Sequence, residues 1–290
     1  MTDPELSEVV LQSDVLDVVV LPDAGARVHS IRAFGVELLR TAFDAAVHLD
    51  DPFHWGGYHL VPWANRLDAG PQQVLGQRVD LRRNHPDGSA IHGLEYAAAW
   101  EQVGDASFQH DGGGDATGWP WTYDTAVVYT LDGPTLTLDY ALTNTSDRMM
   151  PAGLGFHPWF RTPSTLQIPS GSVFSDNADP AVRPSPVVGP LDLRTPAPVA
   201  VGTDACWVDL SEPAVTLRWD DLGVQLTMSA DRPDIVAVAA RLPHIDAVAV
   251  ELQTHAPAGV RRLLHREHYA MHALPPGDTL HLTLTLAFTR

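Results

Sequence analysis

The chain has 290 residues, 8 tryptophans and a hydrophobic fraction of 44%, which is typical of a folded globular protein and not of a disordered one. Its formal net charge of −18 argues against a nucleic acid or an anionic membrane surface as partner, because both are bound through clustered cations. All 18 basic residues are arginine, so chemistry that needs a lysine, such as a Schiff base or a P-loop, is excluded.

The sequence predicts a protein of the cytoplasm that does not contact a membrane. Residues 1–5 are acidic and lack the basic and apolar regions of a signal peptide. No apolar run reaches the roughly 18 residues that a membrane span needs. Cys206 is the one cysteine, which excludes an intrachain disulfide and a cysteine-rich zinc site. The apolar residues beside Cys206 predict a buried strand and not a reactive thiol.

Alternation of apolar and polar residues with a period of two runs through the chain and predicts strands. In chain order, the alternating segments are residues 15–21, 127–131, 135–140, 215–219, 224–228, 247–252 and 279–286. Helical periods are confined to short pieces near residues 4–12 and 260–268. Prolines and glycines between the segments mark turns. The pattern therefore predicts an all-β fold, a large antiparallel β-sandwich.

No shift in composition and no internal repeat divides the sequence. We therefore expect residues 1–290 to form a single domain, a size that all-β folds often reach. Residues 163–198 are rich in Pro and Ser and predict long surface loops, which often form the rim of a functional site. The glycines within residues 111–115 predict a flexible turn, and the acidic residues beside them argue against phosphate binding.

Four motifs concentrate residues that are suited to proton transfer. They are Leu-Val-Pro-Trp-Ala-Asn-Arg-Leu at 60–67, Ile-His-Gly at 91–93, Gly-Phe-His-Pro-Trp-Phe at 155–160 and Val-Glu-Leu-Gln-Thr at 250–254. Together they supply two imidazoles, one guanidinium and one carboxylate, a workable set for general acid–base chemistry.

Two of these residues stand out by their surroundings. Glu251 lies in an apolar stretch, where a carboxylate is either paired or functional, although a solvent-facing strand position is the alternative. His157 follows glycines and precedes Pro158, which restrain the backbone as a positioned acid requires. The alternative for His157 is a histidine of the core whose hydrogen bonds are satisfied.

In this order the motifs resemble those of the aldose 1-epimerase (galactose mutarotase) family, and matches at residues 22–27 and 274–278 extend the resemblance over nearly the whole chain. The resemblance implies a single-domain β-supersandwich that interconverts the α and β anomers of free aldoses. A base takes the proton of the anomeric hydroxyl, an acid gives one to the ring oxygen, and the opened ring closes on its other face. Small sugars are the implied partners, and neither a cofactor nor a metal is required.

The resemblance also assigns roles to single residues. It implies that Glu251 is the base and His157 the acid, and that His92 hydrogen-bonds the sugar near the ring oxygen. Arg66 would donate to sugar hydroxyls, for which its fork of donors is suited. The alternative for Arg66 is a salt bridge at a strand end, with Asp68 or another acid.

Three further residues complete the predicted sugar site. Asp204 would accept hydrogen bonds from sugar hydroxyls, with the nearby Asp192 as a competing candidate. Asn65 is counted among the substrate-binding residues, with bracing of its loop as the role that we favour. Trp207 would either stack on the apolar face of a pyranose or belong to the core.

Two other functions remain open. A hexose-phosphate 1-epimerase would need cations at the far end of the sugar, for which Arg82 with Arg83 and Arg261 with Arg262 are available. A non-catalytic sugar-binding or regulatory protein could use the same fold, although it would have no need of an acid and a base. The sequence leaves the preferred aldose open, and equally whether the protein is a monomer or a homodimer.

Several histidines outside the four motifs have no assigned function. On one helix, His265, His268 and His272 would share a face as metal ligands can, but their spacing matches no standard zinc site. We therefore expect no metal. His255, directly after the last motif, has no role that the sequence reveals.

Overall fold

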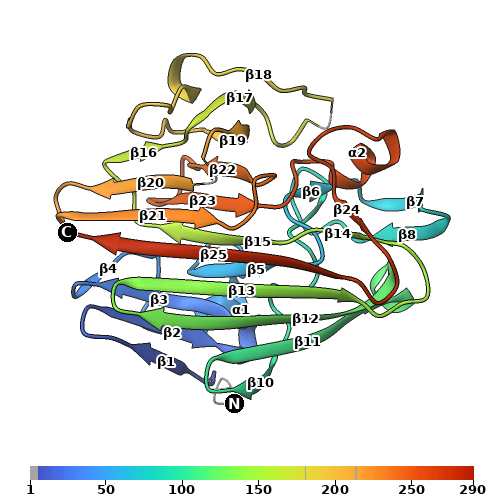
Figure 1. The fold of residues 1–290 in the computed structure, drawn as a ribbon, viewed down its shortest axis with the longest axis horizontal. Helices are drawn as coiled ribbons and strands as arrows, with labels where there is room; N and C mark the ends of the chain where they lie inside the picture. Colours follow the sequence, from blue (N-terminus) through green and yellow to red (C-terminus); the bar gives the residue numbers. More distant parts are fainter. Residues whose placement is uncertain (1–5, 180, 213) are drawn as a thin grey trace.

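Two large antiparallel sheets make up most of the computed structural model, which describes residues 6–179, 181–212 and 214–290 (Figure 1). The first sheet has 11 strands, and β4 (Val36–Glu37) pairs with β3 outside the main order. From one edge to the other, that order is β1 (Val9–Gln12), β2 (Leu16–Leu21), β3 (Arg27–Ala33), β5 (Gly57–Leu60), β15 (Gly155–Phe160), β23 (Val248–Gln253), β22 (Val236–Ala240), β19 (Asp204–Leu210), β17 (Ser170–Phe174) and β18 (Ser185–Pro186).

The second sheet has 8 strands and packs against the first. Its order is β10 (Glu101–Gly104), β11 (Ser107–Gly114), β12 (Trp119–Asp132), β13 (Thr135–Asn144), β25 (Thr279–Thr289), β21 (Val224–Ala230), β20 (Ala214–Trp219) and β16 (Thr165–Gln167). The short ladders are β6 (Arg66–Leu67) with β9 (Ala90–Ile91), β7 (Gly70–Val74) with β8 (Gln77–Leu81), and β14 (Met150–Ala152) with β24 (His272–Leu274). The helical pieces are α1 (Val47–Asp50), α2 (Gly259–His265), and the 3-10 turns η1 (Pro22–Ala24), η2 (Asp115–Thr117) and η3 (Gly189–Leu191).

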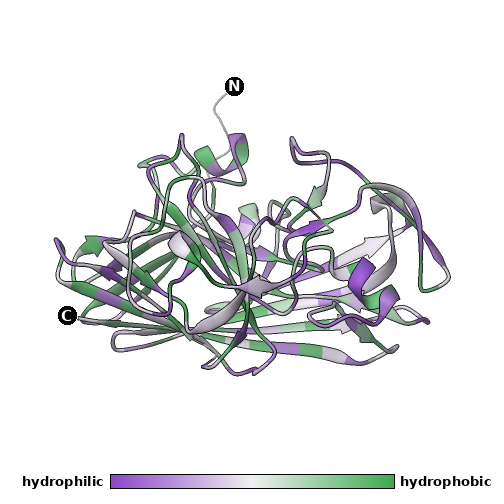
Figure 2. Ribbon diagram, turned by 90° about the horizontal axis from the view of Figure 1, so that it is seen from above, coloured by the Kyte–Doolittle hydropathy of each residue, from purple (hydrophilic) through white to green (hydrophobic). Residues whose placement is uncertain are grey.

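The core lies between the two sheets, and apolar side chains of both join one buried cluster. Hydrophobic and hydrophilic residues alternate along the strands in Figure 2, as the period-two segments of the sequence predicted. A polar contact also crosses this core, because His59 Nδ1 of β5 lies 2.8 Å from the hydroxyl of Tyr140 in β13. The all-β prediction is therefore confirmed, and all seven alternating segments lie in strands except for their first residues Val15 and Ala247 in two of them.

Three local predictions were wrong or only partly right. Residues 9–12 form strand β1 and not a helix, because they pair with β2; residues 4 and 5 lie outside the described residues. Residues 111–114 are no flexible turn but extend β11 along β12. A side chain at Gly112 would lie 2.4 Å from the Glu95 carboxylate, which is why this strand needs glycine there. The region 163–198 contains three short strands between its loops.

The two α-helices found among the described residues are short. The predicted helix near residues 260–268 is α2, which ends at His265 because Arg266 adopts a left-handed conformation with φ of 55°. No helix within the described residues has the length and the apolar character that crossing a membrane requires.

Trp207 of β19 belongs to the fully buried side chains of the core, and its indole nitrogen donates to the Leu191 carbonyl at 3.0 Å. We expect Trp207→Ala to lower the free energy of unfolding by about 3–5 kcal/mol, because it leaves a cavity and an unpaired carbonyl. Denaturant titration followed by circular dichroism measures this loss. The control is Val201→Ala at a position that is 60% exposed, where we expect a change within about 0.5 kcal/mol. Equal losses for both variants would contradict the placement of Trp207 in the core.

Candidate active site

The central strands of the first sheet are buried on both faces. In β23, Val250 and Leu252 join the core, while Glu251 between them points to the opposite face. In β15, His157 likewise points away from its core neighbour Phe156. Because side chains alternate along a strand, the sheet places a polar row on the face away from the second sheet. This row lines a cavity of about 350 Å³, here called the catalytic cavity, whose size is typical of a small-molecule site.

A carboxylate and an imidazole are in contact in this cavity. Phe156 pairs with Leu252 in the register of β15 with β23, so that the next positions place His157 opposite Glu251. His157 Nε2 lies 3.2 Å from Glu251 Oε1, and both side chains are almost fully buried. The side-chain amide of Gln253 donates to the other carboxylate oxygen. The strand register thus brings together the two residues that the resemblance assigned as base and acid.

Burial shifts the protonation of both groups toward their neutral forms. Removal from water raises the pKa of the Glu251 carboxyl to about 8 and lowers the pKa of the His157 imidazole to about 3. Near neutral pH, the pair therefore holds one ionisable proton between a carboxylate oxygen and an imidazole nitrogen. Such a pair can accept one proton and release another without a change in its net charge.

Aromatic rings fix the plane of the His157 imidazole. Tyr58 of β5 is the cross-strand partner of His157, and its ring stacks on the imidazole at 4.5 Å with an interplanar angle of 16°. The His92 ring meets the same imidazole edge-on, with centroids 4.8 Å apart. The buried guanidinium of Arg27 lies 5.2 Å from the Tyr58 ring centroid, as in a cation–π contact. These contacts restrict His157 to one orientation.

The backbone around His92 is in a conformation that few residues adopt. His92 has φ of 63°, and its N–H donates to the Asn65 carbonyl at 3.0 Å. A side chain at Gly93 would lie 1.9 Å from the Val61 carbonyl oxygen, so glycine is required there. Burial, with His157 nearby, holds the pKa of His92 well below its usual value. Neutral His92 therefore faces the cavity as the resemblance implied.

Asn65 and His255 brace the loop that carries Arg66. Asn65 is also in the left-handed region, with φ of 52°, and its side-chain oxygen accepts from the Arg66 N–H at 2.8 Å. His255 Nε2 accepts from the Ala64 N–H at 3.0 Å, while Nδ1 donates to the Ala256 carbonyl at 2.8 Å. His255, whose role the sequence did not reveal, thus ties this loop to the end of β23.

Arg66 and Asp204 form a charged wall of the cavity. Arg66 Nη2 lies 3.0 Å from Asp204 Oδ2, and Arg66 Nε lies 2.7 Å from Asp87. The Asn177 amide donates to the second oxygen of Asp204 at 2.6 Å. The salt-bridge alternative for Arg66 is therefore correct, with Asp87 and Asp204 as partners and not Asp68, and its contact with sugar hydroxyls stays a prediction. Both members of the Arg66–Asp204 pair still line the cavity.

Two of the sequence candidates lie away from the cavity. Trp207 is absent from the described lining and belongs to the core, since it lies an odd number of positions from Asp204 in β19 and faces the second sheet. Its predicted stacking on a sugar is therefore corrected to a structural role. Asp192 pairs with Arg194 at 2.7 Å on the surface, so Asp204 is the aspartate of the cavity.

His265, His268 and His272, whose spacing in the sequence argued against metal binding, do not share one helix face. His265 ends α2, and His272 begins β24 after an irregular segment. Among the described residues, no group of three His, Cys, Asp or Glu side chains is placed to hold a metal ion. Likewise, Arg66 is the one arginine in the described lining of the catalytic cavity, so the arginine pairs considered for a phosphate lie elsewhere.

Sequence reasoning missed several cavity residues. Asn177 comes from the loop after β17, within the region 163–198 that was predicted to rim a site. Tyr58 is next to His59 in β5, and strand alternation assigns it to the cavity face once His59 is placed in the core. Trp159 lines the cavity from β15, held by a 2.6 Å hydrogen bond from its indole nitrogen to the Phe53 carbonyl.

Comparison with known proteins places this fold and its motifs in one family. The family model described as aldose 1-epimerase matches residues 8–284. The uncharacterized protein YihR of Escherichia coli is 29% identical over 141 residues, a match that spans 43% of this chain and 44% of that protein, less than half of its length.

Solved structures show the same fold at low sequence identity. A galactose mutarotase-like protein from Clostridium acetobutylicum superposes with a TM-score of 0.82 at 16% identity, covering 97% of this chain and 94% of that one. An aldose epimerase homologue from C. elegans superposes with a TM-score of 0.80 at 15% identity, covering 98% and 99%. The predicted supersandwich is thereby confirmed. Because the family model spans nearly all of its length, this chain belongs to the aldose 1-epimerase family.

Proposed function

We propose that this protein is an aldose 1-epimerase that interconverts the α and β anomers of a free aldose, with Glu251 as the base and His157 as the acid. The observation that supports this most is the buried His157–Glu251 pair, 3.2 Å apart in a cavity of about 350 Å³. Exclusion of water shifts the pKa values of both side chains away from their usual values, as is common for catalytic acids and bases.

At rest the shared proton lies on Glu251, and in the proposed reaction it first moves to His157, which leaves Glu251 ionised as the base. Glu251 takes the proton of the C1 hydroxyl while His157 gives its proton to the ring oxygen, and the C1–O5 bond breaks as the aldehyde forms. The proton of the pair then rests on Glu251. After rotation about the C1–C2 bond, the two transfers run in reverse and close the ring on its other face. The net charge of the pair stays zero throughout, whether the proton lies on His157 or on Glu251. Neither step needs a cofactor or a metal.

The surrounding residues would hold the sugar for this exchange. Arg66 and Asp204 offer a donor and an acceptor to ring hydroxyls, and His92 offers a ring nitrogen near the acid. Trp159 presents an aromatic surface for the apolar face of a pyranose. Asn65 contributes by fixing the loop of Arg66 and not by a direct contact that the proposal needs.

The two alternatives differ from this proposal in what they require. A hexose-phosphate substrate would need a free cation at the cavity, but the Arg66 charge is already paired with two aspartates. A sugar-binding protein without activity would not need a buried acid–base pair, whose burial costs stability. Free-sugar mutarotation is therefore the activity to test first.

We expect the wild type to accelerate the mutarotation of freshly dissolved α-D-glucose or α-D-galactose above the buffer rate, measured by polarimetry. Glu251→Gln and His157→Asn should each lower kcat by about 10²–10⁴-fold, because each removes one proton-transfer group. Glu212→Gln and His265→Asn make the same chemical changes at exposed positions and should keep wild-type rates. A wild type that matches buffer on both sugars, yet binds them, would establish the sugar-binding alternative.

The pH profile of kcat/KM should be level below neutrality and fall above about pH 8. Burial raises the pKa of Glu251 to about 8, so above that pH the pair loses its one shared proton and keeps a base without an acid. The decline should approach about tenfold per pH unit once the base-catalysed background is subtracted. A rate that instead rises through pH 8 would show that the active pair carries no shared proton.

The same burial of Glu251 should lower the free energy of unfolding of the wild type. Its folded pKa of about 8 lies above that of the unfolded chain, so the unfolded state releases this proton first and stability falls as pH rises toward 8. We expect Glu251→Gln to be more stable than wild type at pH 8 by about 1–3 kcal/mol, or a few degrees in Tm. Thermal unfolding at both pH values should show the difference shrinking near pH 5. An unchanged Tm at pH 8 would argue against the raised pKa.

A further inference from the structure

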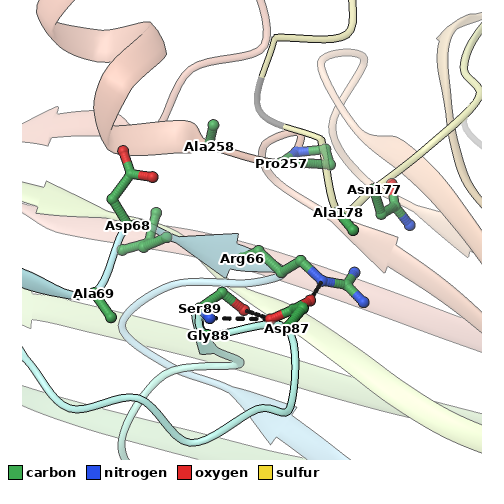
Figure 3. A pocket seen from close by; sticks show the side chains of 11 residues that line it. Arg66, Asp68, Ala69, Asp87, Gly88, Ser89, Asn177, Ala178, Pro257 and Ala258 are labelled. Atoms are coloured by element: carbon green, nitrogen blue, oxygen red, sulfur yellow. Dashed lines mark hydrogen bonds and ion pairs between the residues drawn. The ribbon is translucent and has the colours of Figure 1, made fainter.

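A second cavity, of about 260 Å³, lies directly beyond the Arg66 wall and is here called the outer cavity. Figure 3 shows Arg66 between Asp68 on one side and Asn177 on the other, with the Pro257–Ala258 turn above them. Arg66 and Asn177 line both the outer and the catalytic cavity. The two cavities are therefore neighbours that share a polar wall.

The shared wall is built from buried or paired groups and not from loose surface side chains. Arg66 is fixed at both ends of its guanidinium, by Asp87 on the side of the outer cavity and by Asp204 on the catalytic side. Asp87 is fixed in turn by Ser89, whose hydroxyl donates to it at 2.6 Å. The wall is therefore formed before any ligand arrives, which lowers the entropic cost of binding.

Asn177 carries the strongest sign of a missing partner. Its side chain is 2% exposed, and its amide nitrogen is used by Asp204. Its side-chain oxygen is buried and has no hydrogen-bond donor among the described residues. An unpaired buried oxygen costs about 1–3 kcal/mol, and because Asn177 lines both cavities, a ligand hydroxyl that reaches this oxygen would supply the missing donor.

The chemistry of the outer cavity selects for a neutral ligand rich in hydroxyl groups. Asp68 and Ser89 offer oxygen acceptors, and Asn177 adds its unpaired oxygen. The oxygens of Asp87 are already used by Ser89, Arg66 and His85. The charge of Arg66 is already balanced by two aspartates, so an anionic group would meet net negative charge. Hydroxyl groups, which donate to carboxylates, fit this lining, whereas phosphates and carboxylates do not.

We infer that the outer cavity is a second sugar subsite, and that reducing disaccharides or longer reducing oligosaccharides are preferred over monosaccharides. The inference rests on the proposed function: the reducing-end ring lies at His157 and Glu251, and the next sugar lies beyond Arg66. The glycosidic bond remains intact, because apart from the two proton transfers the bond that breaks and re-forms is the one between the anomeric carbon and the ring oxygen of the reducing unit.

Polarimetry of reducing glucose disaccharides linked 1→3, 1→4 and 1→6, with glucose beside them, tests this preference. We expect kcat/KM for at least one disaccharide to exceed that of glucose by about tenfold, a difference that one or two good hydrogen bonds supply. If glucose is converted and none of the disaccharides exceeds it, the second subsite is refuted while the proposed function stands.

Variants that fill the outer cavity separate a subsite from a general effect. Ala69→Trp and Ala178→Trp place an indole in it from opposite walls, without touching the catalytic pair. Each should reduce kcat/KM for the preferred disaccharide by about tenfold or more and leave glucose within about twofold. Ala181→Trp lies on the same loop as Ala178 but outside the lining, and it should change neither rate. Equal losses on both substrates would overturn the subsite.

If no sugar is converted at all, the proposed function fails, and calorimetry then decides the subsite by itself. Tighter binding of a disaccharide than of glucose, lost in Ala178→Trp, would retain the second subsite in a protein that only binds sugars. Equal or absent binding of the two ligands would refute it.

Discussion

The exclusion of water from one carboxylate is the physical constraint on which the rest of this site depends. Glu251 points from β23 into the catalytic cavity, yet it is only 2% exposed because the residues around the cavity cover it. A charge in that position is costly, and contact with His157 offsets the cost only partly. What results is a pair that holds one proton near neutral pH, so that one member can take up a proton while the other releases one, as reversible proton exchange with a sugar requires.

Strand register positions some side chains of the site, and loop conformation positions the others. Adjacent strands place His157 and Glu251 with little freedom, since a shift of one residue would turn both toward the core. The loops add groups whose placement depends on unusual backbone conformations, as at Asn65 and His92, where positive φ values cost energy that the surrounding hydrogen bonds must supply. Rigid strands thus form the floor, and locally strained loops form the walls.

The site residues that could be predicted from the sequence are those that lie in contiguous motifs. His157 and Glu251 were predictable because each lies in a short segment with a recognisable pattern, and the β-fold followed from period-two alternation. Asn177 could not be predicted, because its position depends on how a loop packs against Asp204, 27 residues later. The sequence could in principle have assigned Trp207 to the core and not to the sugar site, since strand alternation from Asp204 places it on the core face.

The separation of strands from loops also bears on how such proteins diverge. The floor residues lie on strands whose other face is core, so that most changes there would be removed through loss of fold stability. Asp87 and Asn177 belong instead to connecting segments outside the strands, where substitutions, insertions and deletions are tolerated far better. Descendants of one ancestral chain can therefore change the residues of the cavity walls while they inherit the His157–Glu251 pair unchanged.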